Sequence, residues 1–281
     1  MTTKVGFIGL GSMGSALADN ILQAGFDLMV YDVREEPMKE FVRRGAKAGG
    51  SAAEVGAHGE IIETAVVDDA QTEVVALGEK GILERARPGS LILLHSTIHP
   101  KTVRKIAEAA KAKSVGVLDA QMSGGQAGAR AKKLCFMVGG ESSDFEKCRP
   151  VLSASAAHII HAGETGMGAT AKLAQQTIIC LNRMAAYEGM MLAEKAGLDP
   201  EILEQIVRVT PAQSQIADHW VERYRELKDV GPEAARWTAH LFYKGLCPAL
   251  ELAHEVGFSA PGIALVMQRF EWLLGLKKDK D

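Results

Sequence analysis

Short apolar runs alternate with segments of helical periodicity up to about residue 163. Residues 4–9 form a β-type run that ends in glycine, residues 15–25 have apolar positions at helical spacing, and residues 27–32 form a second β-type run. This order predicts a βαβ unit. Further strand-like segments follow at 60–67, 90–96 and 114–120, and a further helical segment lies at 100–113. The alternation predicts a doubly wound, parallel α/β sheet with helices on both faces.

The strand signal stops after about residue 163. Residues 168–196 contain no proline, which predicts one helix of about 29 residues ended by Gly197. The remaining helical segments are 200–209, 212–227, 232–246 and one after Pro261, separated by Pro200, Pro211, Gly231-Pro232, Pro248 and Pro261. We therefore predict an α/β domain over 1–163 and an all-helical domain over 164–281, joined by the long helix.

Composition and charge narrow the function classes. The chain is 47% hydrophobic and 24% charged, with a net charge of −3, which gives no electrostatic reason to expect a nucleic-acid or membrane partner. No apolar run approaches the roughly 18 residues of a membrane span. The four cysteines form no CxxC pair, and Pro100 denies His95 and His99 a common helix, so we expect no metal site. These features favour the cytoplasm.

A glycine-rich sequence follows the first strand-like run. Its residues, Gly9-Leu10-Gly11-Ser12-Met13-Gly14, lie between a predicted strand and a predicted helix. In this context GxGxxG is typical of a Rossmann dinucleotide cradle, where the glycines allow a tight turn, close approach of the pyrophosphate and close helix–strand packing. The helix N-terminus would supply N–H groups to the phosphates. A plain turn between strand and helix is the alternative.

Asp32 follows Gly14 by 18 residues, at the end of the second strand-like run. A carboxylate there accepts hydrogen bonds from the ribose hydroxyls of NAD and repels the 2′-phosphate of NADP. We therefore predict NAD as cofactor. Arg34 lies two residues further on and keeps NADP open as the alternative.

Four segments in sequence order carry a resemblance to a known family. They are Gly6–Gly14, Asp119–Ala129, Gly166–Lys172 and Lys244-Gly245-Leu246. Together they resemble the β-hydroxyacid dehydrogenase family, which includes 3-hydroxyisobutyrate dehydrogenase and, more distantly, 6-phosphogluconate dehydrogenase. The likeness covers nearly the whole chain.

The resemblance implies roles for individual residues. Lys172 would exchange a proton with the substrate oxygen while a hydride moves between the substrate carbon and the nicotinamide. Ser123, Gly124 and Gly125 would bind the substrate carboxylate with a hydroxyl and backbone N–H groups, and Gln176 would share the helix face of Lys172. On the cofactor side, the resemblance points to Val67, Asp68, Thr97 and Lys244. The alternatives are a flexible loop at 123–125, a solvated lysine at 172, and helix caps at Ser96, Thr97 and Asp69.

Several positions depart from the family pattern. Gln176 stands where the family usually has asparagine, Gln121 where it has proline, and Gly245 where aspartate commonly follows the lysine. Lys132-Lys133 replace a usual Gly-Thr pair, and His95, which we interpret as structural, replaces a residue that is often acidic. These departures indicate an unusual substrate or a divergent member.

The sequence thus predicts an NAD-dependent oxidoreductase for a small 3-hydroxy acid or its semialdehyde, with the nicotinamide, the carboxylate and Lys172 in a cleft between the domains. The resemblance and the long helix further imply a homodimer or homotetramer. Two alternatives stay open at this stage: an imine reductase, which shares the architecture but generally has an acid or tyrosine at position 172, and a non-catalytic dinucleotide sensor or scaffold.

Overall fold

The structure, a computed structural model, describes residues 2–222 and 232–273 of the chain. The chain divides into two compact units, Met1–Lys172 and Leu173–Asp281, which we call the N-terminal and the C-terminal unit. The division falls within one long helix, whose first turn belongs to the N-terminal unit.

Eight strands form one sheet in the N-terminal unit, in the order β3-β2-β1-β4-β5-β6-β7-β8. Their bounds are β1 Lys4–Ile8, β2 Asp27–Tyr31, β3 Lys47–Ala48, β4 Ile61–Thr64, β5 Leu91–Leu94, β6 Gly116–Ser123, β7 Leu134–Gly139 and β8 Ala156–Gly163. The order reverses between β1 and β4, and at such a switch point a crevice opens beyond the carboxyl ends of the strands. The doubly wound fold is thereby confirmed.

One pair of strands departs from the predicted parallel arrangement. β6 and β7 pair antiparallel, whereas the other neighbours are parallel. Only residues 124–133 connect the two strands, which is shorter than the crossover of a dozen or more residues that a parallel pair needs. The prediction of an entirely parallel sheet was therefore wrong at this pair.

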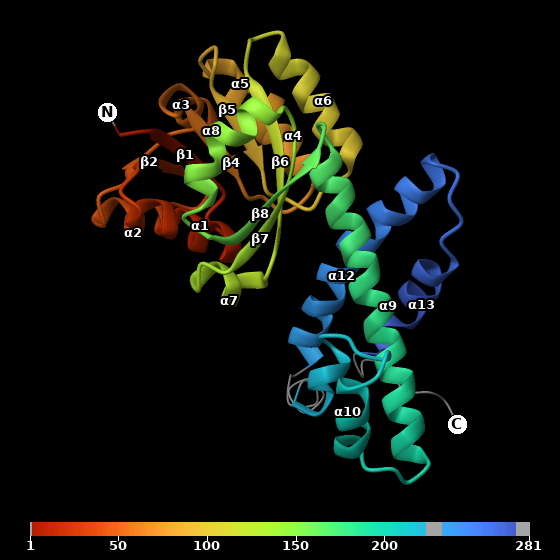
Figure 1. The fold of residues 1–281 in the computed structure, drawn as a ribbon. Coiled ribbons are helices and arrows are strands. Elements are labelled where there is room, and N and C mark those ends of the chain that lie inside the picture. Colours follow the sequence, from red (N-terminus) through yellow and green to blue (C-terminus); the bar gives the residue numbers. More distant parts are fainter. Residues whose placement is uncertain (1, 223–231, 274–281) are drawn as a thin grey trace. The chain divides into compact units, whose positions relative to one another are not determined.

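Helices cover both faces of the sheet, as Figure 1 shows. They are α1 Ser12–Gln23, α2 Glu35–Arg43, α3 Ala52–His58, α4 Asp69–Leu77, α5 Ile82–Arg85, α6 Pro100–Lys111, α7 Gly125–Arg130 and α8 Ser142–Leu152. The four buried residues of β5 show how the layers form. Leu91 and Leu93 enter the core beneath α1, α2 and α8, while Ile92 and Leu94 enter the core beneath α3, α5 and α6. A strand buried on both faces is apolar throughout.

Helix α9 runs from Met167 to Lys195 without a break and confirms the predicted long helix (Figure 1). The C-terminal unit adds α10 Pro200–Arg208, the 3-10 helix η1 Ala217–His219, α12 Pro232–Glu255 and α13 Pro261–Leu273. Helices α9, α12 and α13 share a core that contains Leu173, Cys180, Leu246 and Val266.

Two expected helix boundaries were wrong. Helix α12 continues through Pro248. The proline removes one helical hydrogen bond, but the flanking residues Leu246 and Ala249 stay buried in the core. The expected helix over 212–227 does not begin at 212: the first helical turn is η1 at Ala217, and the Ser214 hydroxyl before it accepts the Ala217 N–H. Residues 223–231 of this segment lie outside the described residues.

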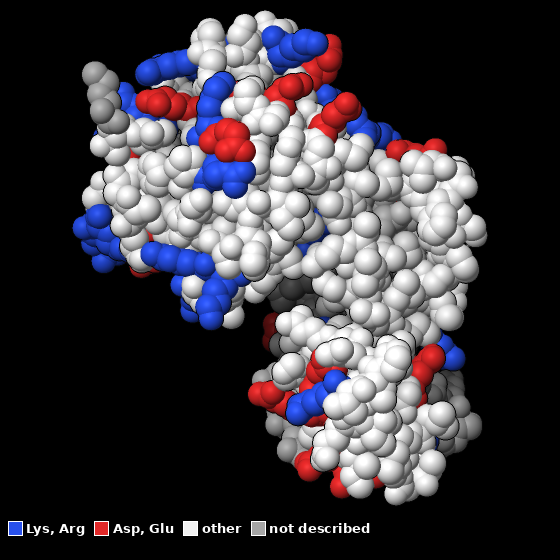
Figure 2. Space-filling view, in the orientation of Figure 1, with Lys and Arg blue, Asp and Glu red and all other residues white. Residues whose placement is uncertain are grey.

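The surface of the face in Figure 2 carries basic and acidic side chains side by side. Over residues 2–222 and 232–273, no helix combines the length and the apolar character that crossing a bilayer requires. No disulfide joins any two of Cys135, Cys148, Cys180 and Cys247, all of which lie among the described residues. The cytoplasmic location stays a prediction.

Candidate functional site

The glycine-rich loop lies between β1 and α1, and two of its glycines are required by close contacts. Gly9 has a φ of +92°, and a Cβ there would stand 2.5 Å from the Ala65 carbonyl oxygen. A Cβ on Gly14 would stand 1.8 Å from the Gly9 carbonyl oxygen. Since real Cβ atoms do not approach so closely, any larger residue at either position would displace the loop.

Gly11, in contrast, faces open space. No heavy atom lies within 4 Å of a Cβ built on it. Gly11 is also the N-cap of α1, and neither a side-chain cap nor an acidic residue occupies the first turn of that helix. The N–H groups at the start of α1 therefore remain available to an anion such as a pyrophosphate.

The Asp32 carboxylate joins the end of β2 to this loop. It is 7% exposed and accepts hydrogen bonds from Leu10 N at 2.7 Å, from Arg34 N at 2.9 Å and from Arg34 Nε at 3.0 Å. Burial raises the pKa of this carboxyl, but the bonds from Arg34 and Leu10 outweigh burial and hold the pKa below its usual 3.8. Asp32 is therefore a stable anion at neutral pH, with Arg34 folded over it.

A cavity of about 700 Å³ adjoins Asp32 at the carboxyl ends of β1, β2 and β4. Its walls are mainly apolar and come from Ile8, Tyr31, Val33, Val66, Val67, Ala70, Val74 and Val75. Val33 and Val67 are exposed, although both are aliphatic. Apolar walls beside a carboxylate suit a purine ring attached to a ribose.

Asp68 has a structural role that the sequence assigned to its neighbour. Its carboxylate accepts the Gln71 N–H at 2.8 Å and caps α4. Asp69, which the sequence suggested as the cap, instead accepts the His99 N–H at 2.9 Å. One oxygen of Asp68 thus caps α4, and the preceding residue, Val67, lines the cavity together with Val66.

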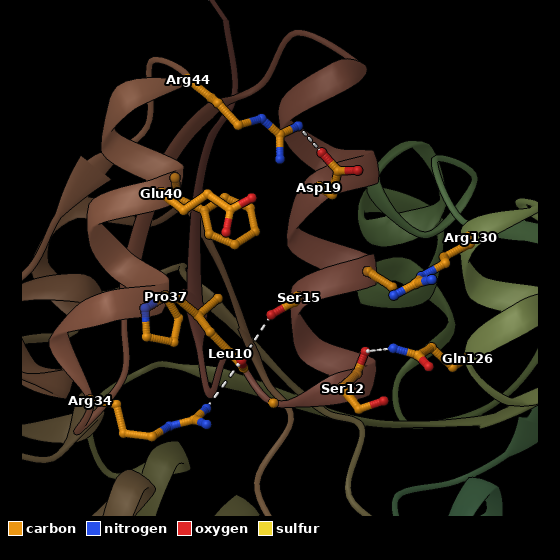
Figure 3. A pocket seen from close by; sticks show the side chains of 13 residues that line it. Leu10, Ser12, Ser15, Asp19, Arg34, Pro37, Glu40, Arg44, Gln126 and Arg130 are labelled. Atoms are coloured by element: carbon orange, nitrogen blue, oxygen red, sulfur yellow. Dashed lines mark hydrogen bonds and ion pairs between the residues drawn. The ribbon is translucent and has the colours of Figure 1, made fainter.

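A second cavity, of about 440 Å³, lies between α1, α2 and α7 (Figure 3). Arg34 lines both cavities. In this second cavity Arg44 pairs with Asp19, and Gln126 of α7 donates to the Ser12 carbonyl oxygen at 3.3 Å. The Gln126 contact joins the loop after β6 to the glycine-rich loop after β1.

Ser96 ties together the loops that follow β4 and β5. Its hydroxyl donates to the Val66 carbonyl oxygen at 2.8 Å and accepts the Val66 N–H at 3.1 Å. Helix α6 is capped by His99, whose ring accepts the Lys101 N–H at 3.2 Å. Neither Ser96 nor Thr97 is therefore the cap of α6, so this alternative for the Ser-Thr pair was wrong.

His95 is buried beneath these loops. Its Nδ1 donates to the Ala120 carbonyl oxygen at 2.7 Å, and its Nε2 lies 2.7 Å from Glu63 Oε2. Since a carbonyl only accepts, Nδ1 carries a proton, and one further proton is shared between Nε2 and Oε2. The pair links β4, β5 and β6, which supports the structural interpretation of His95. Glu63 was missed because nothing in sequence separates it from an ordinary strand residue.

The predicted substrate loop, Ser123 to Gly125, lies at the carboxyl end of β6 and the start of α7. Gly124 and Gly125 have φ values of +129° and +62°, which L side chains rarely adopt. No side chain caps α7, and no heavy atom lies within 4 Å of a Cβ built on Gly125. The loop therefore presents backbone N–H groups in an exposed turn, as an anion site requires.

Lys172 is half-buried, on the second turn of α9. The helix begins against the middle of β6 and the last residues of β7, because a Cβ on Gly168 would stand 2.3 Å from the Asp119 carbonyl oxygen and 2.6 Å from that of Met137. The glycines before Lys172 thus anchor the helix to the sheet.

In the C-terminal unit, Gln176 of α9 meets the Lys244-Gly245 segment of α12. A Cβ on Gly245 would stand 2.8 Å from Gln176 Cγ and 2.9 Å from its Cδ. Two of the departures from the family pattern are therefore in contact, since the longer glutamine occupies space beside a glycine. Sequence reasoning named both positions but could not pair them.

These features fit a dinucleotide. The glycine-rich loop has no side chain at Gly11, where a pyrophosphate must approach. The apolar cavity can accommodate the adenine. Asp32 lies beside both and can accept hydrogen bonds from the ribose. Among the residues that the structure describes, no group of three or more His, Cys, Asp or Glu is arranged to hold a metal ion.

Comparisons with known proteins agree with this geometry. Residues 4–163 match the family described as the NAD binding domain of 6-phosphogluconate dehydrogenase, and residues 166–281 match that described as NAD-binding of NADP-dependent 3-hydroxyisobutyrate dehydrogenase. A probable mitochondrial 3-hydroxyisobutyrate dehydrogenase of Dictyostelium discoideum is 38% identical over 74% of this chain, and the match spans 65% of that relative.

Two bacterial relatives match over most of both chains. A 3-hydroxyisobutyrate dehydrogenase of Pseudomonas aeruginosa is 34% identical, covering 95% of this chain and 91% of its own. A 2-(hydroxymethyl)glutarate dehydrogenase of Eubacterium barkeri is 33% identical, covering 95% and 88%.

Solved structures give the same result. The 3-hydroxyisobutyrate dehydrogenase of Mycobacterium tuberculosis, solved with L-serine, has a TM-score of 0.85 and 29% identity, covering 100% of this chain and 97% of that chain. An imine reductase from a Pseudomonas species, with a TM-score of 0.64, 19% identity and coverage of 98% and 95%, shares the fold alone. The chain belongs to the β-hydroxyacid dehydrogenase family and is an NAD(P)-dependent dehydrogenase that acts on CH–OH groups.

Proposed function

We propose that the chain moves a hydride between NAD and the hydroxyl-bearing carbon of a small 3-hydroxy acid, with Lys172 as proton donor and acceptor. In oxidation the C–H electron pair leaves as hydride to the nicotinamide, and the hydroxyl proton passes to the Lys172 amine. In reduction of the semialdehyde both transfers reverse. The bound dinucleotide supplies the hydride acceptor or donor, and the chain supplies orientation and the proton.

One observation carries this proposal: the first turn of α9 packs on β6 at Asp119, and the same strand leads on into the glycine pair. The backbone N–H groups at Ser123, Gly124 and Gly125 are suited to the substrate carboxylate, and an ammonium group on Lys172 to the alkoxide that develops at the neighbouring carbon. Gln176 would orient the substrate, and Thr97 and Lys244 would lie on the cofactor side.

The names of the relatives support a substrate class. Both 3-hydroxyisobutyrate and 2-(hydroxymethyl)glutarate contain a hydroxymethyl group on the carbon next to a carboxylate, and they differ in the third substituent. We therefore propose a 2-substituted 3-hydroxypropionate. The pairing of Gln176 with Gly245 would bear on which substituent fits.

NAD is the proposed cofactor, because the anionic Asp32 adjoins the adenosine cavity. Its charge would repel a 2′-phosphate at close range. Arg34 already binds the carboxylate, so it offsets this repulsion only by leaving Asp32.

We further propose a homodimer or a homotetramer that forms through the C-terminal unit. Large apolar side chains are exposed along α9 and α10, among them Ile178, Leu192, Ile202 and Ile206. Such side chains favour burial against another chain. Light scattering after gel filtration would measure the oligomer, and a monomer at all concentrations would contradict the proposal.

A substrate panel tests the function. Wild type and K172M would be assayed by NADH absorbance on 2-substituted 3-hydroxypropionates, their semialdehydes and cyclic imines. We expect turnover of the hydroxy acids and a loss of about 10²- to 10⁴-fold in kcat for K172M, the range that general acid–base groups contribute. Equal rates for both proteins would remove Lys172 from the mechanism, and a preference for imines would replace the proposed reaction.

A further inference from the structure

We propose that Asp119 is a positioning residue for Lys172: its carboxylate holds the first turn of α9 and so fixes where the lysine stands. The inference rests on the proposed function, since it takes Lys172 as the proton-transfer group. All the residues involved, from β6 to Lys172, belong to the N-terminal unit.

The carboxylate of Asp119 is bound at both oxygens by the start of α9. Oδ1 accepts the Gly166 N–H at 2.8 Å, and Oδ2 accepts the Ala169 N–H at 2.6 Å. The side chain is completely buried. Among the described residues no cationic side chain forms an ion pair with it, so the N–H groups of α9 and the positive end of that helix are what stabilise the charge.

Helix α9 requires such a distant partner because of its own sequence. The first N–H groups of a helix have no partner within the helix, and an Asp, Ser, Thr or Asn before the first turn usually binds them. Here Gly166, with a φ of +93°, stands before the helix and has no side chain to offer. The Asp119 carboxylate, on strand β6, binds these N–H groups instead, although it lies 47 and 50 residues before them in sequence.

The packing around Asp119 leaves little freedom. A Cβ on Gly139 would stand 2.6 Å from Asp119 Oδ1 and 2.7 Å from the Gly168 nitrogen. Gly168 approaches the β6 backbone equally closely. Burial raises the pKa of Asp119 above its usual 3.8, and the bonds from Gly166 and Ala169 offset this only in part. The Asp119 carboxylate is therefore tightly packed, but burial destabilises its charged form.

Strand β6 consequently holds both halves of the proposed substrate site. Asp119 holds the helix of Lys172, and Ser123, four residues later on the same strand, begins the carboxylate loop. Lys172 follows Ala169 by three residues, about 4.5 Å along the helix axis. Because side chains on a helix lean toward its N-terminus, a shift of this first turn moves the lysine with it.

The variant that tests the contact is D119N. The amide has nearly the shape of the carboxylate, but its NH₂ group must face one of the two N–H donors. We expect the first turn of α9 to shift, and kcat to fall about 10- to 100-fold, the loss that a misplacement of about 1 Å produces. The Kd of NADH, measured by fluorescence, should change less than about 2-fold, because the glycine-rich loop lies on β1.

A matched cap in the same unit separates positioning from stability. The Ser51 hydroxyl accepts the Glu54 N–H at 3.2 Å and caps α3, away from the proposed site. S51A should lower the melting temperature and leave kcat unchanged. If D119N behaved like S51A, with a lower melting temperature and an unchanged kcat, Asp119 would be an ordinary helix cap and the inference would be overturned.

A double variant tests whether the effect passes through Lys172. In a K172M background, D119N should change the residual kcat by less than about 2-fold, since residues that act as a unit are not additive. A further loss of 10-fold or more would overturn the inference, because Asp119 would then act through another group. Full activity of K172M alone would instead contradict the proposed function. If D119N does not fold, D119S, which places no NH₂ group against the two N–H donors, should show the same pattern of a lower kcat with little change in the Kd of NADH.

Discussion

Two buried aspartates stand at the two ends of the candidate site and differ in what stabilises their charge. Asp32, beside the glycine-rich loop, is bound by Arg34 and by Leu10 N–H, which together hold its pKa below the usual value despite burial. Asp119, at the start of α9, meets backbone N–H groups alone, and burial raises its pKa. The cofactor end therefore has a stable anion, whereas the substrate end contains a carboxylate under strain from desolvation.

The difference extends to how each end is built. At the cofactor end, most contacts of the glycine-rich motif are close in sequence: Gly9 and Gly14 pack on each other, and Asp32 follows 22 residues after Leu10, while Ala65 is the distant neighbour of Gly9. At the proposed substrate end, Asp119 meets the start of a helix 47 to 50 residues away. One end is a local motif, and the other depends on tertiary contacts.

The largest effect should come from the support that the two ends share, the buried Glu63–His95 pair. H95L would leave the Glu63 carboxyl buried without its partner, which costs about 3–5 kcal/mol of unfolding free energy. Urea unfolding at neutral pH measures this loss. A change below about 1 kcal/mol would mean that the sheet tolerates an unpaired acid there.

Substitution of two glycines in one loop probes the cofactor end. G14A should destabilise the fold by about 3 kcal/mol and abolish NADH binding, because its Cβ would overlap the Gly9 carbonyl. G11A, with no neighbour within 4 Å, should fold like wild type and weaken only NADH binding. Calorimetry with and without NADH measures both effects. Equal stability of the two variants would show that Gly14 is not under the steric constraint described.

The pH dependence of stability should have opposite signs at the two aspartates. The lowered pKa of Asp32 gives stability that is present above pH 3.8 and is lost as pH falls through the folded pKa. D32N should therefore cost about 2 kcal/mol at neutral pH, the value of hydrogen bonds to a charged group, and less in acid. The raised pKa of Asp119 gives stability that is present below pH 3.8 and is lost as pH rises through the folded pKa.

The deficit of D119N relative to wild type should consequently grow as pH falls, whereas that of D32N shrinks. Urea unfolding of the three proteins between about pH 3 and pH 7 gives both differences. Deficits that change in the same direction with pH would contradict the contrast between the two ends.

The smallest effect concerns Gln176 and Gly245, the two departures from the family pattern that are in contact in the C-terminal unit. G245A should cost about 1 kcal/mol of unfolding free energy, since its Cβ would press on the flexible Gln176 side chain. In Q176N the shorter amide leaves room, so the double variant should be more stable than the sum of the single losses predicts. Strict additivity would show that the two positions do not interact.

Much of the fold could be predicted from the sequence because its signals are local. The two-sided burial of β5, the glycine turn before α1 and the proline-free α9 each follow from a few neighbouring residues. The antiparallel β6–β7 pair and the continuation of α12 through Pro248 could not be predicted in this way. The first follows from the short connection 124–133, which could not be used because no strand was predicted at 134–139, and the second depends on packing in the core of the C-terminal unit.

The candidate site divides similarly. The sequence named Asp32, the Ser123 loop and Lys172, but it gave no role to Asp119 beyond membership of a motif. No pattern connects a strand aspartate with the N–H groups of a helix that begins 48 residues later. The same holds for Glu63, whose only signal is its contact with His95 across the sheet. The roles of the named residues stay predictions until they are measured.

The central claim is that Lys172 exchanges the proton during hydride transfer, and single-turnover kinetics test it most directly. NADH formation would be followed by stopped flow, with saturating NAD and hydroxy acid, across a range of pH for wild type and K172M. We predict that the wild-type rate rises with pH as the amine loses its proton and that the rate of K172M is slow and independent of pH. An identical pH profile and rate for the two proteins would contradict the account.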